Sequence, residues 1–61
     1  MKLLLIFLSS LFNLANTNYE SGNYAEAIEQ YQQVIEEQPA ADAYYNLGNA
    51  YFKQGELAQS I

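Results

Sequence analysis

Carboxylates, asparagine amides and tyrosine hydroxyls are the side chains of this sequence that could take part in chemistry. The sequence has no Cys and no His, so disulfides, thiolate nucleophiles, imidazole bases and the usual zinc sites are excluded. Lys2 and Lys53 are its only cations, and the formal net charge is -5. This acidic balance, with no basic patch, argues against binding to nucleic acid.

Most of the carboxylates fall on one side of a predicted helix. The polar residues on that side are Glu26, Glu29, Gln30, Gln33, Glu36 and Glu37. A carboxylate cluster can bind a metal or transfer protons, but on the polar side of an amphipathic helix it is more typical of a solvated surface. We therefore expect no catalytic residue, no metal and no cofactor, and an enzyme is the least favoured class of function.

The asparagines are better placed for recognition than for catalysis. Asn46, Asn49 and Lys53 are spaced at i, i+3 and i+7, so they share one face of a helix. An asparagine amide offers a donor and an acceptor that can clamp an extended peptide backbone. Tyr45 and Phe52 lie beside them in the sequence and offer apolar area and stacking. The alternative is that these asparagines only face solvent and that the aromatic rings pack on a neighbouring repeat.

Two amphipathic helices must position these residues. The first is predicted over 24–38, because apolar residues recur there at spacings of three and four. Its expected buried face consists of Tyr24, Ala27, Ile28, Tyr31, Val34 and Ile35. Gly22 suits the left-handed conformation before this helix, Asn23 is its predicted cap, and Pro39 stops it.

The second helix is predicted over 43–54, with Asp42 as its N-cap and Gly55 as its end. Its expected packing stripe consists of Tyr44, Leu47, Gly48 and Tyr51. Gly48 costs about 1 kcal/mol relative to Ala inside a helix, so we expect it to allow close approach of a neighbouring helix. Residues 56–61 then begin another helix, which six residues cannot sustain alone.

The segment YYNLGNAYFKQG, residues 44–55, repeats LFNLANTNYESG, residues 11–22, after 33 residues. Asn13 aligns with Asn46, Leu14 with Leu47 and Gly22 with Gly55. A repeat of this period is the signature of stacked helical hairpins, which bury their apolar faces only against one another. An all-α fold follows, and the first question is what the array binds.

These residues resemble the tetratricopeptide repeat. In the second copy the matching residues are Tyr44, Leu47, Gly48, Tyr51 and Gly55. In the first copy they are Leu11, Leu14, Ala15, Gly22, Tyr24, Ala27, Tyr31 and Pro39. Asn18 departs from the pattern where Tyr51 stands in the second copy, which we expect to weaken packing of the first helix. Ser60 replaces an expected alanine, and the usual period is 34, one residue longer.

The resemblance implies antiparallel helical hairpins in a right-handed superhelix, with repeat 1 at 11–39 and an incomplete repeat 2 at 41–61. It also implies a concave groove lined by the first helix of each repeat. In the second copy the groove positions are Asp42, Tyr45, Asn46, Asn49, Phe52 and Lys53. In the first copy they are Phe12, Asn13, Asn16, Tyr19 and Glu20. Glu20 and Lys53 are equivalent and could form an ion pair between adjacent helices.

Residues 1–15 support two interpretations. Lys2 followed by about ten mostly apolar residues is the layout of a signal peptide, with Ala15 as the best cleavage position. The run is too short to span a bilayer, which needs roughly 17 to 25 residues. The other interpretation is the first helix of the array, since cleavage after Ala15 would remove Leu11, Leu14 and Ala15 from the first repeat.

The favoured function is a non-enzymatic scaffold that holds a peptide or partner protein, with further repeats of the same chain as possible neighbours. The alternative is a membrane-tethered or self-associating structural segment, with membrane contact only through residues 1–15. A signal peptide would place the protein in the bacterial envelope or periplasm, or outside the cell. A plain helix would leave it in the cytoplasm. A signal-like start before an acidic repeat pair resembles, by analogy, envelope-associated accessory proteins such as the aerotolerance type.

Overall fold

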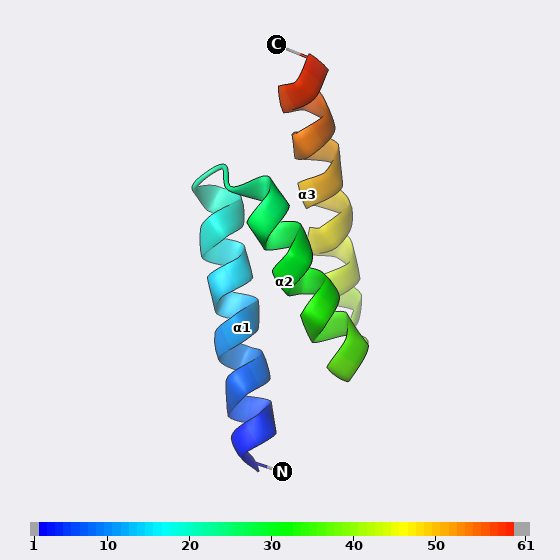
Figure 1. The fold of residues 1–61 in the computed structure, drawn as a ribbon. Helices are drawn as coiled ribbons and strands as arrows, with labels where there is room; N and C mark the ends of the chain where they lie inside the picture. Colours follow the sequence, from blue (N-terminus) through cyan, green and yellow to red (C-terminus); the bar gives the residue numbers. More distant parts are fainter. Residues whose placement is uncertain (1, 60–61) are drawn as a thin grey trace.

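Three helices make up the structure, a computed structural model that describes the backbone of residues 2–59 and the side chains of residues 6–59. They are α1 (Lys2–Glu20), α2 (Tyr24–Glu37) and α3 (Ala41–Gln59). α2 runs antiparallel to both α1 and α3, and the described residues contain no strand (Figure 1). The predicted all-α fold of helical hairpins is confirmed.

α2 is the central helix of the three. It packs along both α1 and α3, whereas α1 and α3 touch each other at few points. The molecule is elongated and measures 44 × 18 × 13 Å. Each helix therefore leaves part of its surface uncovered.

Alanines on all three helices form the centre of the core. Ala15 of α1, Ala27 of α2 and Ala50 of α3 are each 0% exposed. Tyr31 and Ile28 of α2 complete the buried cluster, and Phe12, Tyr19 and Leu47 pack around it. Because the distance between packed helix axes depends on the side chains at the contact, an alanine on each helix lets the three backbones approach closely.

The turn between α1 and α2 is closed by a Schellman motif. Gly22 has φ 86°, a left-handed conformation that glycine adopts without strain. The Asn23 N–H donates to the Asn18 carbonyl at 2.8 Å, and the Gly22 N–H donates to the Tyr19 carbonyl at 3.1 Å. These two bonds satisfy the carbonyls of Asn18 and Tyr19 at the end of α1. The left-handed conformation of Gly22 agrees with the prediction.

Asn23 does not cap α2 through its side chain, contrary to the prediction. Its Nδ2 instead donates to Asn18 Oδ1 at 3.4 Å, across the ends of the Schellman turn. The aromatic rings of Tyr19 and Tyr24 meet edge to face beside it, 5.6 Å apart. The polar side chain is therefore used to hold the turn, and α2 begins with the backbone bond from the Ala27 N–H to the Asn23 carbonyl.

α2 follows its predicted pattern closely. The buried residues are Ala27, Ile28, Tyr31 and Val34. Gln38 is the C-cap, in an extended conformation with its N–H bonded to the Val34 carbonyl. Pro39 explains this ending, because the residue before a proline is pushed out of the helical region.

Of the packing stripe predicted for α3, only Leu47 packs against the core. It begins at Ala41 and not after Asp42, which lies in its first turn, and the Tyr44 N–H bonds to the Ala40 carbonyl. Ala43 and Ala50 are buried, whereas Tyr44 and Gly48 are exposed. Nothing lies within 4 Å of a Cβ built on Gly48, so its predicted role in close helix approach is wrong.

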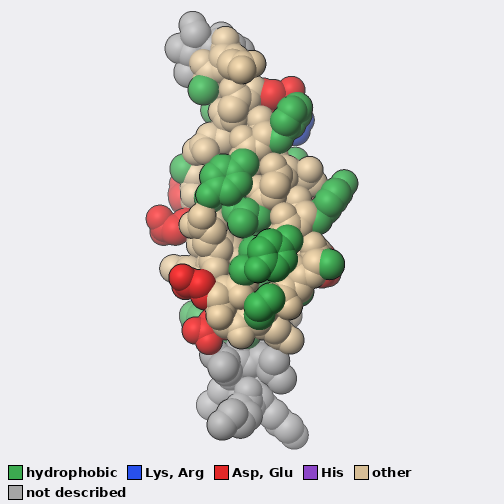
Figure 2. Space-filling view, turned by 90° about the vertical axis from the view of Figure 1, so that its right-hand side faces the viewer, with side chains coloured by type: hydrophobic (Ala, Val, Ile, Leu, Met, Phe, Trp, Pro, Cys, Tyr) green, Lys and Arg blue, Asp and Glu red, His purple; other side chains and the backbone are tan. Residues whose placement is uncertain are grey.

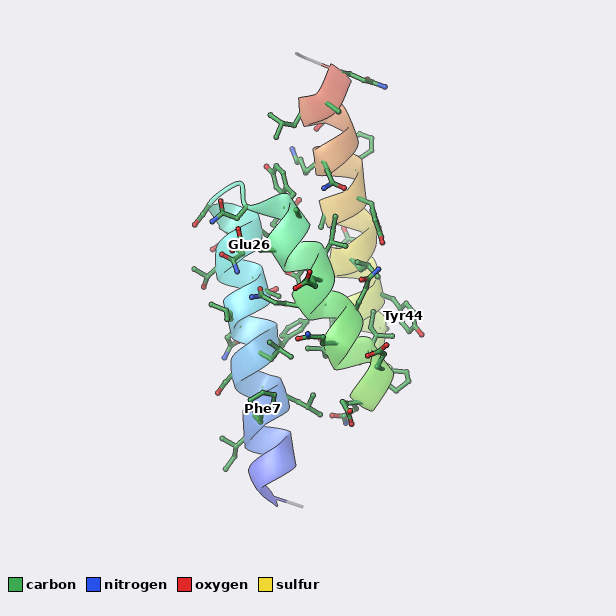
Figure 3. The ribbon with its side chains drawn as sticks, in the orientation of Figure 1. Phe7, Glu26 and Tyr44 are labelled. Atoms are coloured by element: carbon green, nitrogen blue, oxygen red, sulfur yellow. The ribbon has the colours of Figure 1, made fainter. Side chains whose placement is uncertain are left out.

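Four exposed aromatic residues define the outer face of α3. They are Tyr44, Tyr45, Tyr51 and Phe52. Figure 2 shows hydrophobic side chains gathered along this side of the molecule, and Figure 3 shows Tyr44 pointing away from the other helices. Among them Tyr51 has a partner, because Gln32 Nε2 of α2 donates to its hydroxyl at 2.7 Å.

Gly55 does not end a helix, which corrects the predicted break. α3 runs through it to Gln59, past the turn between α1 and α2 (Figure 1). Gly22 is the only glycine with a positive φ, so Gly55 has helical backbone that any residue can adopt. The predicted helix at 56–61 is thus a continuation of α3, and Ser60 and Ile61 lie outside the described residues.

α1 is continuous from Lys2 into the first repeat. Leu8 is buried, whereas Ile6 and Phe7 are each 62% exposed. A helix here agrees with both interpretations of residues 1–15, so the signal peptide stays a prediction. Within the described part of the chain, no helix has the length and apolarity needed to cross a membrane.

Candidate binding groove

A groove runs between α1 and α3, with α2 as its floor, and contains two hollows. The apolar hollow is lined by Leu8, Ser9, Phe12, Val34, Gln38, Ala40, Asp42 and Ala43. The polar hollow is lined by Asn16, Tyr19, Glu20, Tyr31 and Asn46. Each set includes residues from both outer segments and from α2. The edge-to-face contact of Phe12 and Tyr31, 5.8 Å between ring centroids, links one hollow to the other.

Three polar side chains converge in the polar hollow, one from each helix. Asn16 Oδ1 of α1 accepts a hydrogen bond from the Tyr31 hydroxyl of α2. The same oxygen accepts a hydrogen bond from Asn46 Nδ2 of α3 at 3.3 Å. Asn16 and Asn46 are both half-buried. One amide oxygen therefore ties all three helices together at the wall of the groove.

Tyr31 is the buried member of this group, with 1% of its surface exposed. Burial raises the pKa of its phenol above the ordinary value of 10.0, because a phenolate would lose its hydration. The negative charges of Tyr19, when ionised, and of Glu20 raise the pKa further, whereas the amide of Asn46 lowers it. The phenol therefore stays a neutral hydrogen-bond donor at physiological pH.

Six of the eleven predicted groove positions line the two hollows, four from the first copy and two from the second. Asn16, Tyr19 and Asn46 meet in the polar hollow together with Glu20, and Phe12 and Asp42 line the apolar hollow. These positions come from segments more than 20 residues apart in the sequence. The structure thus brings them together as the repeat register implies.

The other predicted residues lie elsewhere. Asn13 is exposed outside both hollows, and its backbone carbonyl accepts a hydrogen bond from Thr17 Oγ1. Tyr45 and Phe52, which are 72% and 66% exposed, belong to the outer face of α3. Asn49 is half-buried but lines neither hollow. Asn13, Tyr45, Asn49 and Phe52 therefore line neither of the two hollows.

Lys53 bonds within its own helix. Its Nζ lies 3.6 Å from Glu56 Oε1, one turn further along α3, and both side chains are about half exposed. The expected ion pair between Glu20 and Lys53 is therefore wrong. Glu20 lies in the polar hollow, whereas Lys53 lies with Tyr24, Glu56 and Leu57 around a different hollow.

Two polar contacts between helices were not predicted from the sequence. Tyr31 belongs to the buried stripe of α2, and the pattern shows only its apolar ring, although the polar tip of a tyrosine usually finds a partner. Asn18 was expected to weaken α1, yet its Nδ2 donates to Gln30 Oε1 of α2 at 2.8 Å. In both cases the sequence signal was a polar group, the Tyr31 hydroxyl or the Asn18 amide, at a position expected to pack against another helix.

The groove presents hydrogen-bonding, charged and apolar groups to a ligand. It offers the amides of Asn16 and Asn46, the Tyr31 hydroxyl, the Glu20 and Asp42 carboxylates and an apolar floor. No group of three or more potential metal-ligating side chains occurs among the described residues. The carboxylates of Glu20 and Asp42 lie in separate hollows, so these two groups do not form a catalytic pair.

Comparison with known proteins matched the sequence profile of one family, described as the tetratricopeptide repeat, over residues 12–61. This range covers the second half of α1 and all of α2 and α3. No curated protein and no solved structure matched the chain.

Proposed function

Because the chain belongs to the tetratricopeptide repeat family, whose repeats mediate protein–protein interaction, we propose that it is a non-enzymatic scaffold. In this proposal the groove between α1 and α3 holds an extended segment of a partner protein. The observation that carries the proposal is the convergence of Asn16, Tyr31 and Asn46, one from each helix, beside an apolar hollow. An extended peptide has unpaired backbone N–H and C=O groups, which can bond to the two amide atoms outside these contacts, Asn46 Oδ1 and Asn16 Nδ2.

Substitution of the groove asparagines tests the proposal. Peptides selected from a random display library against the 61-residue chain would be the probe, and their dissociation constants would be measured by fluorescence anisotropy. We expect Asn16→Ala and Asn46→Ala each to weaken binding about 2- to 13-fold, since a hydrogen bond contributes roughly 0.5 to 1.5 kcal/mol. Asn13→Ala is the matched control, because this asparagine is exposed outside both hollows.

Unchanged affinities for Asn16→Ala and Asn46→Ala would contradict groove binding. Backbone amide shifts in NMR spectra give an independent readout. Bound peptide should perturb α1 near Phe12 and Asn16 and α3 near Ala43 and Asn46. Shifts confined to the outer face of α3 would instead place the partner there.

A second candidate function is self-association, and the outer face of α3 favours it. Four aromatic side chains lie exposed on one helix, which is an unusual concentration of apolar surface for a small monomer. Sedimentation velocity over a range of concentrations separates the two functions. A dimer that is lost in Tyr45→Ser but not in Asn13→Ser would support self-association as a structural segment.

For localisation we propose that the chain is exported and that residues 1–15 stay attached as a helix and membrane tether. The proposal rests on the apolar run after Lys2 and on the burial of Leu8 and Ala15. Cleavage after Ala15 would remove Leu8 and Phe12 and with them one wall of the apolar hollow. An envelope protein of the aerotolerance type is the finer form of this proposal.

The mass of the intact protein purified from its host tests the tether. A mass that includes residues 1–15, in the membrane fraction, is expected. A mature N-terminus near Asn16 would show that the segment is a cleaved signal peptide, and recovery in the cytoplasmic fraction would contradict export.

A further inference from the structure

The charges along the groove are of one sign. Glu20 lines the polar hollow and Asp42 lines the apolar hollow, and neither hollow is lined by Lys or Arg. The one cation whose side chain is described, Lys53, is bonded to Glu56 on α3. With a formal net charge of -5 for the whole chain, the groove has a negative potential that attracts cations and repels anions.

The two hollows select different side chains. The apolar hollow has Leu8, Phe12, Val34 and Ala43 in its lining, so it fits an aliphatic or aromatic group. In the polar hollow, Asn16 Oδ1 already accepts two hydrogen bonds. The exposed Glu20 carboxylate has its acceptor sites available to a ligand, since the ion pair found among the described residues is Lys53–Glu56.

The separation of the hollows sets the spacing of the groups that would fill them. On α1 the apolar hollow is lined by Leu8, Ser9 and Phe12 and the polar hollow by Asn16, Tyr19 and Glu20, so the centres of the two sets are about nine residues apart. At 1.5 Å per helical residue this separation is roughly 13 Å. An extended chain advances about 3.3 Å per residue, so about four residues bridge this distance. An even spacing of four places both side chains on the same side of the strand.

We propose that the groove takes an extended peptide segment with an apolar side chain and, four residues from it, a Lys or Arg. The apolar group enters the apolar hollow, and the cation pairs with Glu20 in the polar hollow. This inference rests on the proposed function, because it assumes that the groove binds a peptide, and it adds the chemical class of the partner. An acidic segment lacks the cation that pairs with Glu20, and a uniformly polar segment lacks the side chain that enters the apolar hollow.

Four synthetic peptides in a serine/threonine host test the spacing and the charge. The first carries phenylalanine and, four residues on, lysine. The others replace lysine with glutamate, replace phenylalanine with serine, or move lysine to five residues from phenylalanine. All are capped and labelled with fluorescein, and binding is measured by anisotropy at low and at high salt.

We expect the first peptide to bind most tightly. The glutamate peptide should bind at least tenfold more weakly, and rising salt should reduce the difference, because exposed charges are screened. Glu20→Gln should weaken binding of the lysine peptide about two- to fivefold, the size expected of a partly exposed ion pair, and should not weaken binding of the glutamate peptide. Glu20 ends α1, where a negative charge opposes the helix dipole, so the variant keeps its fold.

Glu29→Gln is the control, since Glu29 is exposed on α2 and lines neither hollow. Equal binding of lysine and glutamate peptides, with affinity still lost in Asn16→Ala, would overturn the basic-peptide inference and leave groove binding intact. If none of the peptides shifts the amides of the groove, and library-selected peptides do not either, the proposed function fails together with this inference.

Discussion

Asn46 Nδ2 donates a hydrogen bond of 3.3 Å to Asn16 Oδ1, and this bond connects two helices that otherwise touch at few points. The two residues are 30 positions apart. The same oxygen accepts a hydrogen bond from the Tyr31 hydroxyl of α2, so α1, α2 and α3 are joined at one atom. The groove wall is thus held by polar contacts, whereas the core beneath it is held by alanines.

The first prediction concerns the coupling between these asparagines. Asn16→Ala and Asn46→Ala should each lower the free energy of unfolding by about 0.5 to 1.5 kcal/mol, the net contribution of a hydrogen bond. The double variant should lose less than the sum, because each single change already breaks the shared bond. Urea unfolding followed by far-UV circular dichroism gives the four values. Additive losses would mean that the two side chains do not interact in solution.

The second prediction uses the buried phenol. The pKa of Tyr31 is raised above 10.0 in the folded chain, so the folded state binds more protons than the unfolded state once the pH passes about 10. Its contribution is complete below that pH and is lost as the pH rises through the folded pKa. The chain should therefore lose stability in alkaline solution, and Tyr31→Phe should reduce that loss.

Urea midpoints measured from neutral to alkaline pH test this behaviour. Tyr31→Phe should be less stable than the original chain at neutral pH, since it removes the bond to Asn16, and the difference should narrow or reverse as the pH rises. Tyr45→Phe is the control, because this tyrosine is 72% exposed. Parallel pH curves for the original chain and Tyr31→Phe would contradict the raised pKa.

The helices and their order could be predicted from the sequence, because the signals for them are local. Apolar periodicity, Gly22 and Pro39 each determine the conformation of residues only a few positions away. The face that α3 buries could not. The repeat register equates Ala15 with Gly48, yet Ala15 is 0% exposed and Gly48 is exposed. α1 packs against the helix that follows it, whereas α3 packs against the helix that precedes it, so equivalent positions have different neighbours.

The same difference between local signals and tertiary packing applies to the candidate site. Asn16 and Asn46 could be named from the register and from helical spacing, because both follow from position along a helix. Their mutual bond and the part played by Tyr31 could not, since they depend on how three helices converge. Tyr45 and Phe52 were assigned to the groove by equivalence with Phe12 and Tyr19, which have a partner helix across from them.

The third prediction tests this difference between equivalent positions. Ala50→Leu should destabilise the chain by about 1 to 3 kcal/mol, because extra volume at a fully buried position forces the helices apart. Thr17 is the repeat equivalent of Ala50 but is exposed. Thr17→Leu should change the stability by less than about 0.5 kcal/mol. Similar losses for both variants would show that the two copies pack in the same way.

The fourth prediction contrasts the glycines by their backbone conformation. Gly22→Ala should destabilise the chain by about 1 to 2 kcal/mol, because a Cβ is strained at its φ of 86°. Gly48→Ala should stabilise it by roughly 0.5 to 1 kcal/mol, since Gly48 is helical and nothing lies within 4 Å of the added Cβ. Gly55→Ala decides whether α3 is continuous in solution. Helical backbone at Gly55 predicts a gain in stability and in helical content by circular dichroism, whereas a left-handed break predicts a loss like that of Gly22→Ala.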